Sequence, residues 1–225
     1  MDQMKRFAIY FAPRDGAFAD AAAHWLGWDA RTGQSVAQPN VPGMADLTAA
    51  PRRYGFHGTI KPPFRLADGT TPVALGEAVA TLAASLRAVS VEALAMVRLE
   101  GFLALIPQGD TAALADLAAR VVHGLEALRA PLTPEDIARR RPETLTPRQR
   151  ELLAAYGYPY VMEEFQFHLT LSDRLIGPQV PAFEAAAQTH FAGLLPQPFE
   201  FEDLCLFGED LSGQFHLLHR YALSA

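Results

Sequence analysis

Two stretches of the chain carry the same short pattern, Tyr54-Gly55-Phe56-His57-Gly58-Thr59-Ile60-Lys61 and Phe165-Gln166-Phe167-His168-Leu169-Thr170-Leu171-Ser172. Both are rich in aromatic and β-branched residues, which is typical of β-strands. Alternate residues of a strand point to the same face of a sheet. Each predicted strand therefore turns an apolar face towards a core and sets a histidine and a threonine together on its other face.

The pairs His57 with Thr59 and His168 with Thr170 match the needs of phosphodiester cleavage. One group must take a proton from the attacking water or hydroxyl, and another must give a proton to the departing oxygen. Histidine can fill both roles because its ordinary pKa lies near neutrality. Threonine hydroxyls can hold the non-bridging phosphate oxygens, and so can Lys61 on the same predicted face. Of the seven histidines, only these two have a threonine two residues later.

Alternatives stay open for parts of this candidate site. Pro62 follows Lys61 directly and favours a kink that turns the lysine outward. Tyr54 and Arg53 flank the first strand, where they either cover a bound substrate or pack on the surface. The alternative to the whole interpretation is a pair of solvent-exposed strand faces on which each histidine hydrogen-bonds a nearby threonine.

The rest of the chain predicts one order of elements twice: strand, helix, strand with His-x-Thr, helix, strand. This repetition predicts an α+β fold in which a duplicated unit forms two lobes around one cleft. No low-complexity linker separates the halves, so we expect a single bilobal domain over residues 1–225 with interleaved lobes. The predicted strands cover residues 7–11, 54–61, 91–99, 101–106, 165–172, 199–207 and 215–223, and the predicted helices cover 16–28, 72–89, 112–128 and 181–194, with a turn-rich connection over 33–51.

Residues 131–160 interrupt this order and form a basic helical insertion. Thr133-Pro134 and Thr146-Pro147 each predict the start of a short helix, and Gln149 completes a capping-box pattern with Thr146. The segment holds five arginines and is the most basic part of the chain: Arg139, Arg140, Arg141, Arg148 and Arg150. Such a run is either a solvated helical face or a lid whose guanidinium groups, with Arg140 as our candidate, contact a phosphate.

Composition excludes several classes of protein. The net charge is −6, which gives no electrostatic footprint for duplex nucleic acid. The single cysteine, Cys205, cannot form an internal disulfide. No apolar run is long enough for a secretory leader or a membrane span, so we expect a cytoplasmic protein with no membrane partner. No His/Asp/Glu cluster has metal-ligand spacing, and the sequence has neither a Gly-rich phosphate loop nor a Gly-x-Ser-x-Gly motif. We therefore expect no metal and no cofactor.

The two motifs, His57-Gly58-Thr59-Ile60 and His168-Leu169-Thr170-Leu171, resemble the signatures of the two-histidine (2H) phosphoesterase superfamily. Longer strings resemble one uncharacterised branch, domain of unknown function 1045, which is associated with phosphonate-utilisation operons. They are Arg53-Tyr54-Gly55-Phe56-His57-Gly58-Thr59-Ile60-Lys61-Pro62-Pro63-Phe64, Glu163-Glu164-Phe165-Gln166-Phe167-His168-Leu169-Thr170-Leu171 and Arg6-Phe7-Ala8-Ile9-Tyr10-Phe11-Ala12-Pro13.

The resemblance implies a 2H (LigT-like) fold with two antiparallel sheets around a central cleft and helices on the outside. It implies a metal-independent hydrolase in which His57 and His168 share the acid and base roles, while Thr59 and Thr170 bind phosphate. The implied substrate is a small, cyclic phosphodiester, with phosphonate metabolism as the setting. Two alternatives remain: a phosphodiesterase for 2′,3′-cyclic nucleotides or RNA ends, and a regulator that binds a phosphate or phosphonate ligand without turning it over.

Overall fold

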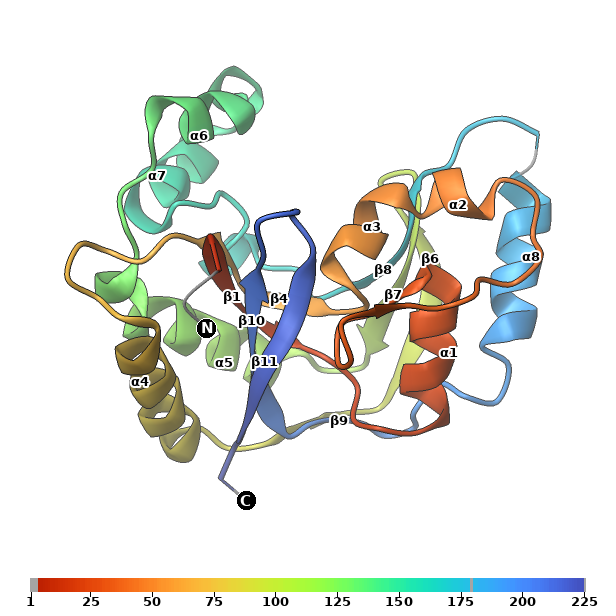
Figure 1. Ribbon diagram of the computed structural model, residues 1–225, viewed down its shortest axis with the longest axis horizontal. Coiled ribbons are helices and arrows are strands. Elements are labelled where there is room, and N and C mark those ends of the chain that lie inside the picture. Colours follow the sequence, from red (N-terminus) through yellow and green to blue (C-terminus); the bar gives the residue numbers. More distant parts are fainter. Residues whose placement is uncertain (1–3, 179, 225) are drawn as a thin grey trace.

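Seven strands form one antiparallel sheet in the computed structural model, which describes residues 4–178 and 180–224 (Figure 1). The strand order is β11-β10-β1-β4-β8-β7-β6. The strands are β1 (Arg6–Phe11), β4 (Gly58–Phe64), β6 (Ala93–Leu99), β7 (Phe102–Gln108), β8 (Leu169–Arg174), β10 (Asp203–Glu209) and β11 (Phe215–Ala222), and two small ladders pair β2 (Trp28–Asp29) with β3 (Gln34–Ser35) and β5 (Val89–Val91) with β9 (Phe199–Phe201).

The pairing between strands is shortest between β4 and β8, where a single pair of residues, Gly58 and Leu169, joins the two strands. Every other neighbouring pair of strands in this sheet is matched over three or more residue pairs. The two predicted antiparallel sheets are thus the two parts of one sheet, β11-β10-β1-β4 and β8-β7-β6, and the predicted α+β class is confirmed. Each part takes strands from both halves of the chain, since β10 pairs with β1 and β7 pairs with β8.

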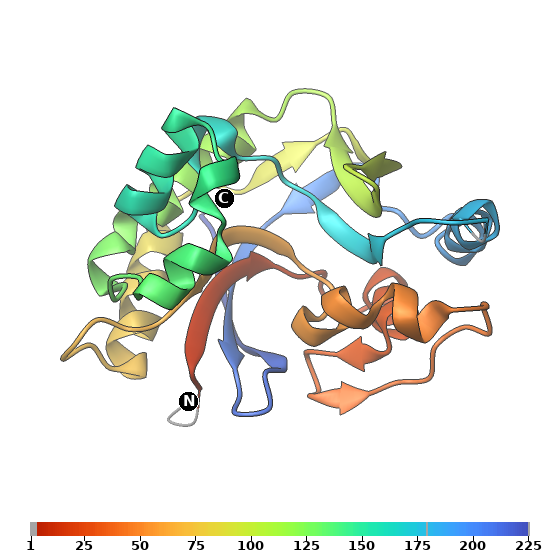
Figure 2. The same cartoon turned by 90° about the horizontal axis from the view of Figure 1, so that it is seen from above.

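Helices flank this sheet at its two ends, as Figure 2 shows. At one end lie α1 (Ala17–Leu26), α2 (Met44–Leu47), α3 (Ala49–Tyr54) and α8 (Val180–His190), and at the other lie α4 (Pro72–Ser85), α5 (Ala112–Gly124), α6 (Pro134–Arg139) and α7 (Pro147–Tyr156). Three 3₁₀ turns complete the chain: η1 (Glu126–Leu128), η2 (Pro142–Thr144) and η3 (Met162–Glu164). Among the described residues, no helix is long and apolar enough to cross a lipid bilayer.

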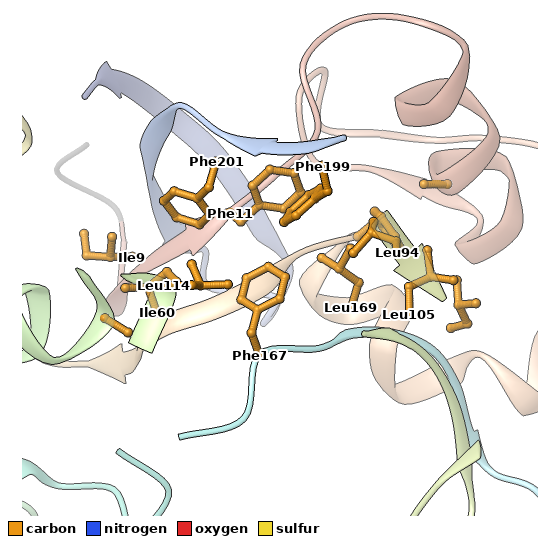
Figure 3. Close-up of a cluster of buried hydrophobic side chains, with 14 of the residues drawn as sticks. Ile9, Phe11, Ile60, Leu94, Leu105, Leu114, Phe167, Leu169, Phe199 and Phe201 are labelled. Carbon is orange, nitrogen blue, oxygen red and sulfur yellow. The ribbon is translucent and has the colours of Figure 1, made fainter. Parts of the chain in front are cut away.

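An aromatic cluster fills the core beneath the junction of β4 and β8 (Figure 3). The ring of Phe167 lies 6.0 Å from Phe11, 5.8 Å from Phe199 and 6.3 Å from Phe201, measured between centroids. Such pairs contribute roughly 0.5–1.5 kcal/mol each beyond the area that they bury. Phe167 directly precedes His168, so the core fixes the backbone that carries this histidine.

The predicted capping signals are confirmed in the insertion. Thr133 and Thr146 each accept a hydrogen bond from the backbone N–H three residues later, which begins α6 and α7. In turn, the Gln149 side chain accepts a hydrogen bond from the backbone N–H of Thr146, as the sequence predicted, and the Asp136 side chain accepts one from the backbone N–H of Thr133. A proline at the first helical position of each helix adds to the signal because its fixed φ suits a helix start.

Two expectations about the first motif are corrected. Tyr54 is the last residue of α3 and not part of a strand, and the turn-rich connection before it contains the short helices α2 and α3. The strand β4 begins at Gly58 and runs through Pro62 and Pro63, which we expected to end it. Among the described residues, no strand pairs with this side of β4 beyond Gly58, and prolines, which lack an N–H donor, are tolerated on such an edge.

Candidate active site

The two histidines lie in the wall of a single cavity of about 360 Å³, together with Thr59 and Thr170. Each histidine directly precedes its strand, and the next residues, Gly58 and Leu169, are the one pair that joins β4 to β8. The junction of the two parts of the sheet therefore brings the two His-x-Thr motifs to the same place.

His57 is held by its backbone and by two tyrosine rings. Its Nδ1 lies 2.9 Å from the carbonyl oxygen of Gly55. A carbonyl only accepts hydrogen bonds, so Nδ1 carries the proton and Nε2 of the neutral ring keeps its lone pair. The ring centroid lies 4.0 Å from that of Tyr10 and 5.6 Å from that of Tyr54. These contacts leave Nε2 as the nitrogen that can accept a proton.

His168 repeats this arrangement on the other strand. Its Nδ1 lies 2.8 Å from the carbonyl oxygen of Gln166, again two residues earlier in the chain. The ring packs at 5.7 Å from Phe102. In both residues Nδ1 therefore carries a proton, and Nε2 is the nitrogen that can gain or lose one.

Burial is the main reason that the pKa of His57 is lowered to about 4; the hydrogen bond to Gly55 opposes this shift, and the electrostatic effect of His168 adds a smaller lowering. His57 is therefore uncharged at neutral pH. A neutral imidazole with a free Nε2 can act as a base.

This lowered pKa predicts that acid destabilises the fold through His57. Between the unfolded-state pKa near 6.5 and the folded-state pKa near 4, the unfolded chain binds the proton more tightly, so stability falls as the pH falls. From pH 7 to pH 5, His57 should account for a loss of about 2 kcal/mol in the free energy of unfolding. Urea unfolding of wild type and His57→Gln at both pH values measures this. The matched control is His24→Gln at an exposed helical site, and an equal pH dependence in wild type and His57→Gln would contradict the assignment.

The two threonines present hydroxyl groups without an internal partner. Within the described part of the chain, neither the Thr59 nor the Thr170 hydroxyl forms a hydrogen bond, although both line the cavity. Ser172, which shares the face of Thr170, differs because its Oγ accepts the N–H of Leu103 at 2.9 Å and donates to the carbonyl of Asp173 at 2.8 Å. The hydroxyls of Thr59 and Thr170 therefore remain available to donate hydrogen bonds to a ligand in the cavity.

Lys61 does not share the cleft face with His57, which corrects the expectation from spacing. Thr59 pairs with Tyr10 but Lys61 pairs with Ile9, so an extra residue, Ile60, lies between the two pairs. This β-bulge turns Lys61 to the opposite face of the sheet. There its Nζ is buried and lies 2.8 Å from Glu126 Oε2 and 3.2 Å from the carbonyl of Val122.

Tyr54 and Arg140, the two remaining candidates, both line the cavity. Tyr54 reaches it from the end of α3, with its ring stacked on Phe215 at 4.9 Å. Arg140 reaches it from the basic insertion, with its guanidinium 4.7 Å from the ring centroid of Tyr158. The other four arginines of the insertion do not line this cavity.

Sequence reasoning missed Tyr10, which faces Thr59 across β1 and β4. Burial raises the pKa of Tyr10 well above its ordinary value, so the hydroxyl stays protonated as a donor. No described residue hydrogen-bonds this hydroxyl, and the side chain lines the cavity. The sequence signal for Tyr10 was the alternation in the first strand, where Ala8, Tyr10 and Ala12 lie on the face opposite to Phe7, Ile9 and Phe11.

Sequence analysis also did not predict five other residues of the cavity wall: Arg6, Phe102, Tyr158, Asp173 and Arg174.

The described residues contain no group of three or more His, Cys, Asp or Glu side chains arranged to hold a metal ion. His216, for example, pairs with Asp210 alone, at 2.8 Å. The cavity wall offers two imidazoles, the hydroxyl groups of threonine, serine and tyrosine side chains, one carboxylate and three guanidinium groups.

The chain is similar to known proteins over most of its length. A family model described as "Protein of unknown function (DUF1045)" matches residues 59–216. Two curated proteins named "Ribose 1,5-bisphosphate phosphokinase PhnN" are each 36% identical: that of Janthinobacterium sp. (strain Marseille) over 222 residues, with 94% of this chain and 49% of that protein, and that of Laribacter hongkongensis (strain HLHK9) over 211 residues, with 92% and 49%. The chain spans about half the length of these relatives.

Solved structures are more distant. "Crystal structure of E.coli LigT in apo form" is 12% identical with a TM-score of 0.44, and "Crystal structure of phosphoesterase" is 13% identical with a TM-score of 0.43, each over 99% of both chains. The assignment to a family therefore rests on the sequence match.

Proposed function

We propose that this chain, which belongs to the family of proteins of unknown function DUF1045, hydrolyses a small cyclic phosphodiester by acid–base catalysis between His57 and His168. One observation carries the proposal. Two imidazoles, each fixed through Nδ1 to the backbone carbonyl two residues earlier, line the same cavity as two threonine hydroxyls that have no described partner.

The lowered pKa of His57 makes this residue the base of our mechanism and leaves His168 as the acid. His57 Nε2 takes a proton from water as the water oxygen forms its bond to phosphorus. The phosphorus–oxygen bond to the departing oxygen breaks, and the protonated His168 gives that oxygen its proton. The product is a phosphomonoester with a free hydroxyl group. General acid–base catalysis of this kind contributes about 10²–10⁴-fold to the rate.

In this mechanism three neutral donors hold the non-bridging oxygens. The hydroxyls of Thr59, Thr170 and Tyr10 all line the cavity, and each is without an internal hydrogen-bond partner among the described residues. Donors that are fixed before the reaction stabilise the charge that develops on these oxygens without reorganising. Arg140 at the edge of the cavity adds a positive charge.

The names of the curated relatives suggest a ribosyl phosphate as the class of substrate, because those proteins are named for ribose 1,5-bisphosphate. Their kinase activity is not proposed for this chain. The sequence lacks the Gly-x₄-Gly-Lys-Ser/Thr loop that holds nucleotide phosphates in many kinases, and it matches only about half of each relative. A ribosyl cyclic phosphate fits both this suggestion and the resemblance to phosphonate-associated 2H proteins.

Purified protein should therefore turn over at least one member of a panel of cyclic phosphodiesters in the presence of EDTA. The panel contains ribose 1,2-cyclic phosphate and the four 2′,3′-cyclic nucleotides, and the phosphomonoester product, followed over time by its mass, gives the rate. Turnover restricted to 2′,3′-cyclic nucleotides would favour the RNA-end activity. Saturable binding without turnover would favour a regulator, and activity abolished by EDTA and restored by a divalent cation would contradict the metal-independent mechanism.

A further inference from the structure

A second cavity of about 280 Å³ adjoins the histidine cavity. The two share five wall residues: Arg6, Tyr54, Pro62, Pro63 and Arg140. The second cavity lies between the far end of β4 and the insertion that carries α6 and α7, which stand at the same end of the molecule as α4 and α5 (Figure 2). The two cavities are therefore immediate neighbours.

The wall of this second cavity carries more positive charge than the nearby carboxylates can neutralise. Seven of its residues are basic: Arg6, Arg53, Lys61, Arg65, Arg129, Arg139 and Arg140. Three carboxylates pair with them, and each carboxylate is shared by two of the cations. The chain as a whole has a net charge of −6, so this concentration of cations is not a consequence of composition.

Glu209 and Asp136 are each shared by two arginines. Glu209 forms ion pairs with Arg6 and Arg53, each with a nitrogen–oxygen distance of 2.5 Å, and Asp136 forms ion pairs with Arg65 and Arg139. The Arg65 guanidinium holds the pKa of Asp136 well below its ordinary range, so this carboxylate stays charged. One negative charge between two guanidinium groups leaves one positive charge over, and several of their N–H donors remain unused.

Glu126 forms the third shared pair, deeper in the wall. Its Oε2 lies 2.8 Å from the Lys61 Nζ and its Oε1 lies 2.6 Å from an Arg129 nitrogen. Arg129 also donates to the carbonyl of Ala130 at 2.9 Å. Lys61 and Arg129 use more of their N–H donors within the protein than the cations around Glu209 and Asp136 do. They therefore hold this part of the wall in place and add to its positive electrostatic potential.

Arg140 completes the arrangement because no carboxylate pairs with it in the described part of the chain. Its guanidinium rests on the face of Tyr158, and the residue lines both cavities. A guanidinium with free donors at this shared edge matches the geometry of a phosphate, which accepts two parallel N–H bonds.

We propose that the second cavity binds a phosphomonoester of the same substrate, so that the substrate is a cyclic phosphodiester with an additional phosphate group. This inference rests on the proposed function for its assignment of the ester at the histidines. A dianionic phosphate would neutralise part of the excess charge and accept hydrogen bonds from Arg53, Arg65, Arg139 and Arg140. A substrate without this group would leave the cluster unneutralised.

Matched pairs of substrates test the proposal. Ribose 1,2-cyclic phosphate and 2′,3′-cyclic AMP are each compared with the same compound phosphorylated on the 5-hydroxyl (5′-hydroxyl in the nucleotide) of the ribose. The kcat/KM of the phosphorylated compound, divided by that of its unphosphorylated partner, gives the preference for the second phosphate. We expect a preference of at least a hundredfold in wild type for at least one pair. The ratio should fall at least tenfold in Arg65→Gln and in Arg139→Gln, since a hydrogen bond to a charged group is typically worth about tenfold or more.

Arg141→Gln is the matched control, because Arg141 is exposed, follows Arg140 directly and lines neither cavity. Its ratio should stay within about twofold of wild type. Equal turnover of both members of each pair would overturn the second site and leave the proposed function standing. An equal loss of preference in Arg141→Gln would also overturn it, because the effect would then be one of overall charge.

Calorimetric titration with ribose 5-phosphate keeps the second site testable if no ester is turned over. This compound carries the phosphomonoester alone. Saturable binding by wild type that weakens at least tenfold in Arg65→Gln or Arg139→Gln, and not in Arg141→Gln, would support the site even if the proposed function fails. Absence of saturable binding by wild type, together with no turnover, would overturn it.

Discussion

His57→Ala and His168→Ala should each lower kcat for the cyclic phosphodiester about a thousandfold, with a smaller effect on KM. Each variant removes one of the two proton-transfer groups, and such a group contributes about 10²–10⁴-fold to the rate. The hydroxyls of Thr59, Thr170 and Tyr10 in the cavity wall would remain in both variants. The double variant should lose little more than either single variant, because the two groups act in one step and their effects are not additive.

The measurement is steady-state kinetics on variants whose folding is checked by circular dichroism and thermal unfolding. His24→Ala is the matched control, since His24 is exposed on α1 and lies outside the cavity. Retention of more than a tenth of wild-type kcat in either cavity variant would rule out the acid–base pair. A loss in one variant only would show that the two histidines do not share the reaction.

The two imidazoles are equivalent in how they are held and different in what surrounds them. Both use the same Nδ1 contact to a carbonyl two residues earlier. His57 packs between Tyr10 and Tyr54, whereas His168 contacts Phe102. Burial lowers the pKa of His57, so this imidazole is neutral near pH 7 and its Nε2 can accept a proton.

Sequence predicted the features that depend on local pattern. The alternation around His57 and His168 predicted that each histidine and its threonine share a face, and both pairs line the cavity. The Thr-Pro signals predicted the starts of α6 and α7. These succeed because a cap or a strand face is determined by residues within a few positions of one another.

Features that depend on pairing between distant strands could not be predicted in this way. The face of Lys61 is reversed by a bulge at Ile60, and this bulge is defined only by the register of β4 against β1. The second cavity gathers Arg6, Arg53 and Arg65 from the N-terminal third with Arg129 and Arg140 from the middle of the chain. From the sequence, only the arginine run of the insertion could be identified as basic. The other cations are far apart in the chain, and no local pattern predicts that they lie together.

Gly58→Val should destabilise the fold by about 3 kcal/mol and lower kcat at least a hundredfold. Gly58 forms the only residue pair between β4 and β8, and a Cβ at this position would lie 2.4 Å from Phe167 Cζ, 2.5 Å from Phe167 Cε2 and 3.2 Å from Leu169 Cδ2. The Phe167 ring cannot retreat without displacing Phe11, Phe199 or Phe201 (Figure 3). The two strands must therefore move apart, and with them His57 and His168.

A double-mutant cycle with Phe167→Leu separates this clash from a general intolerance of substitution at Gly58. The smaller side chain removes the ring atoms that a Cβ at residue 58 would meet, so the double variant should be less destabilised than the sum of the single variants, by about 1 kcal/mol or more. Urea unfolding gives the four free energies, and kcat is measured on the same proteins. Simple additivity would show that Phe167 is not what excludes a side chain at residue 58. Unchanged kcat in a destabilised Gly58→Val protein would show that the separation of β4 and β8 does not set the distance between the histidines.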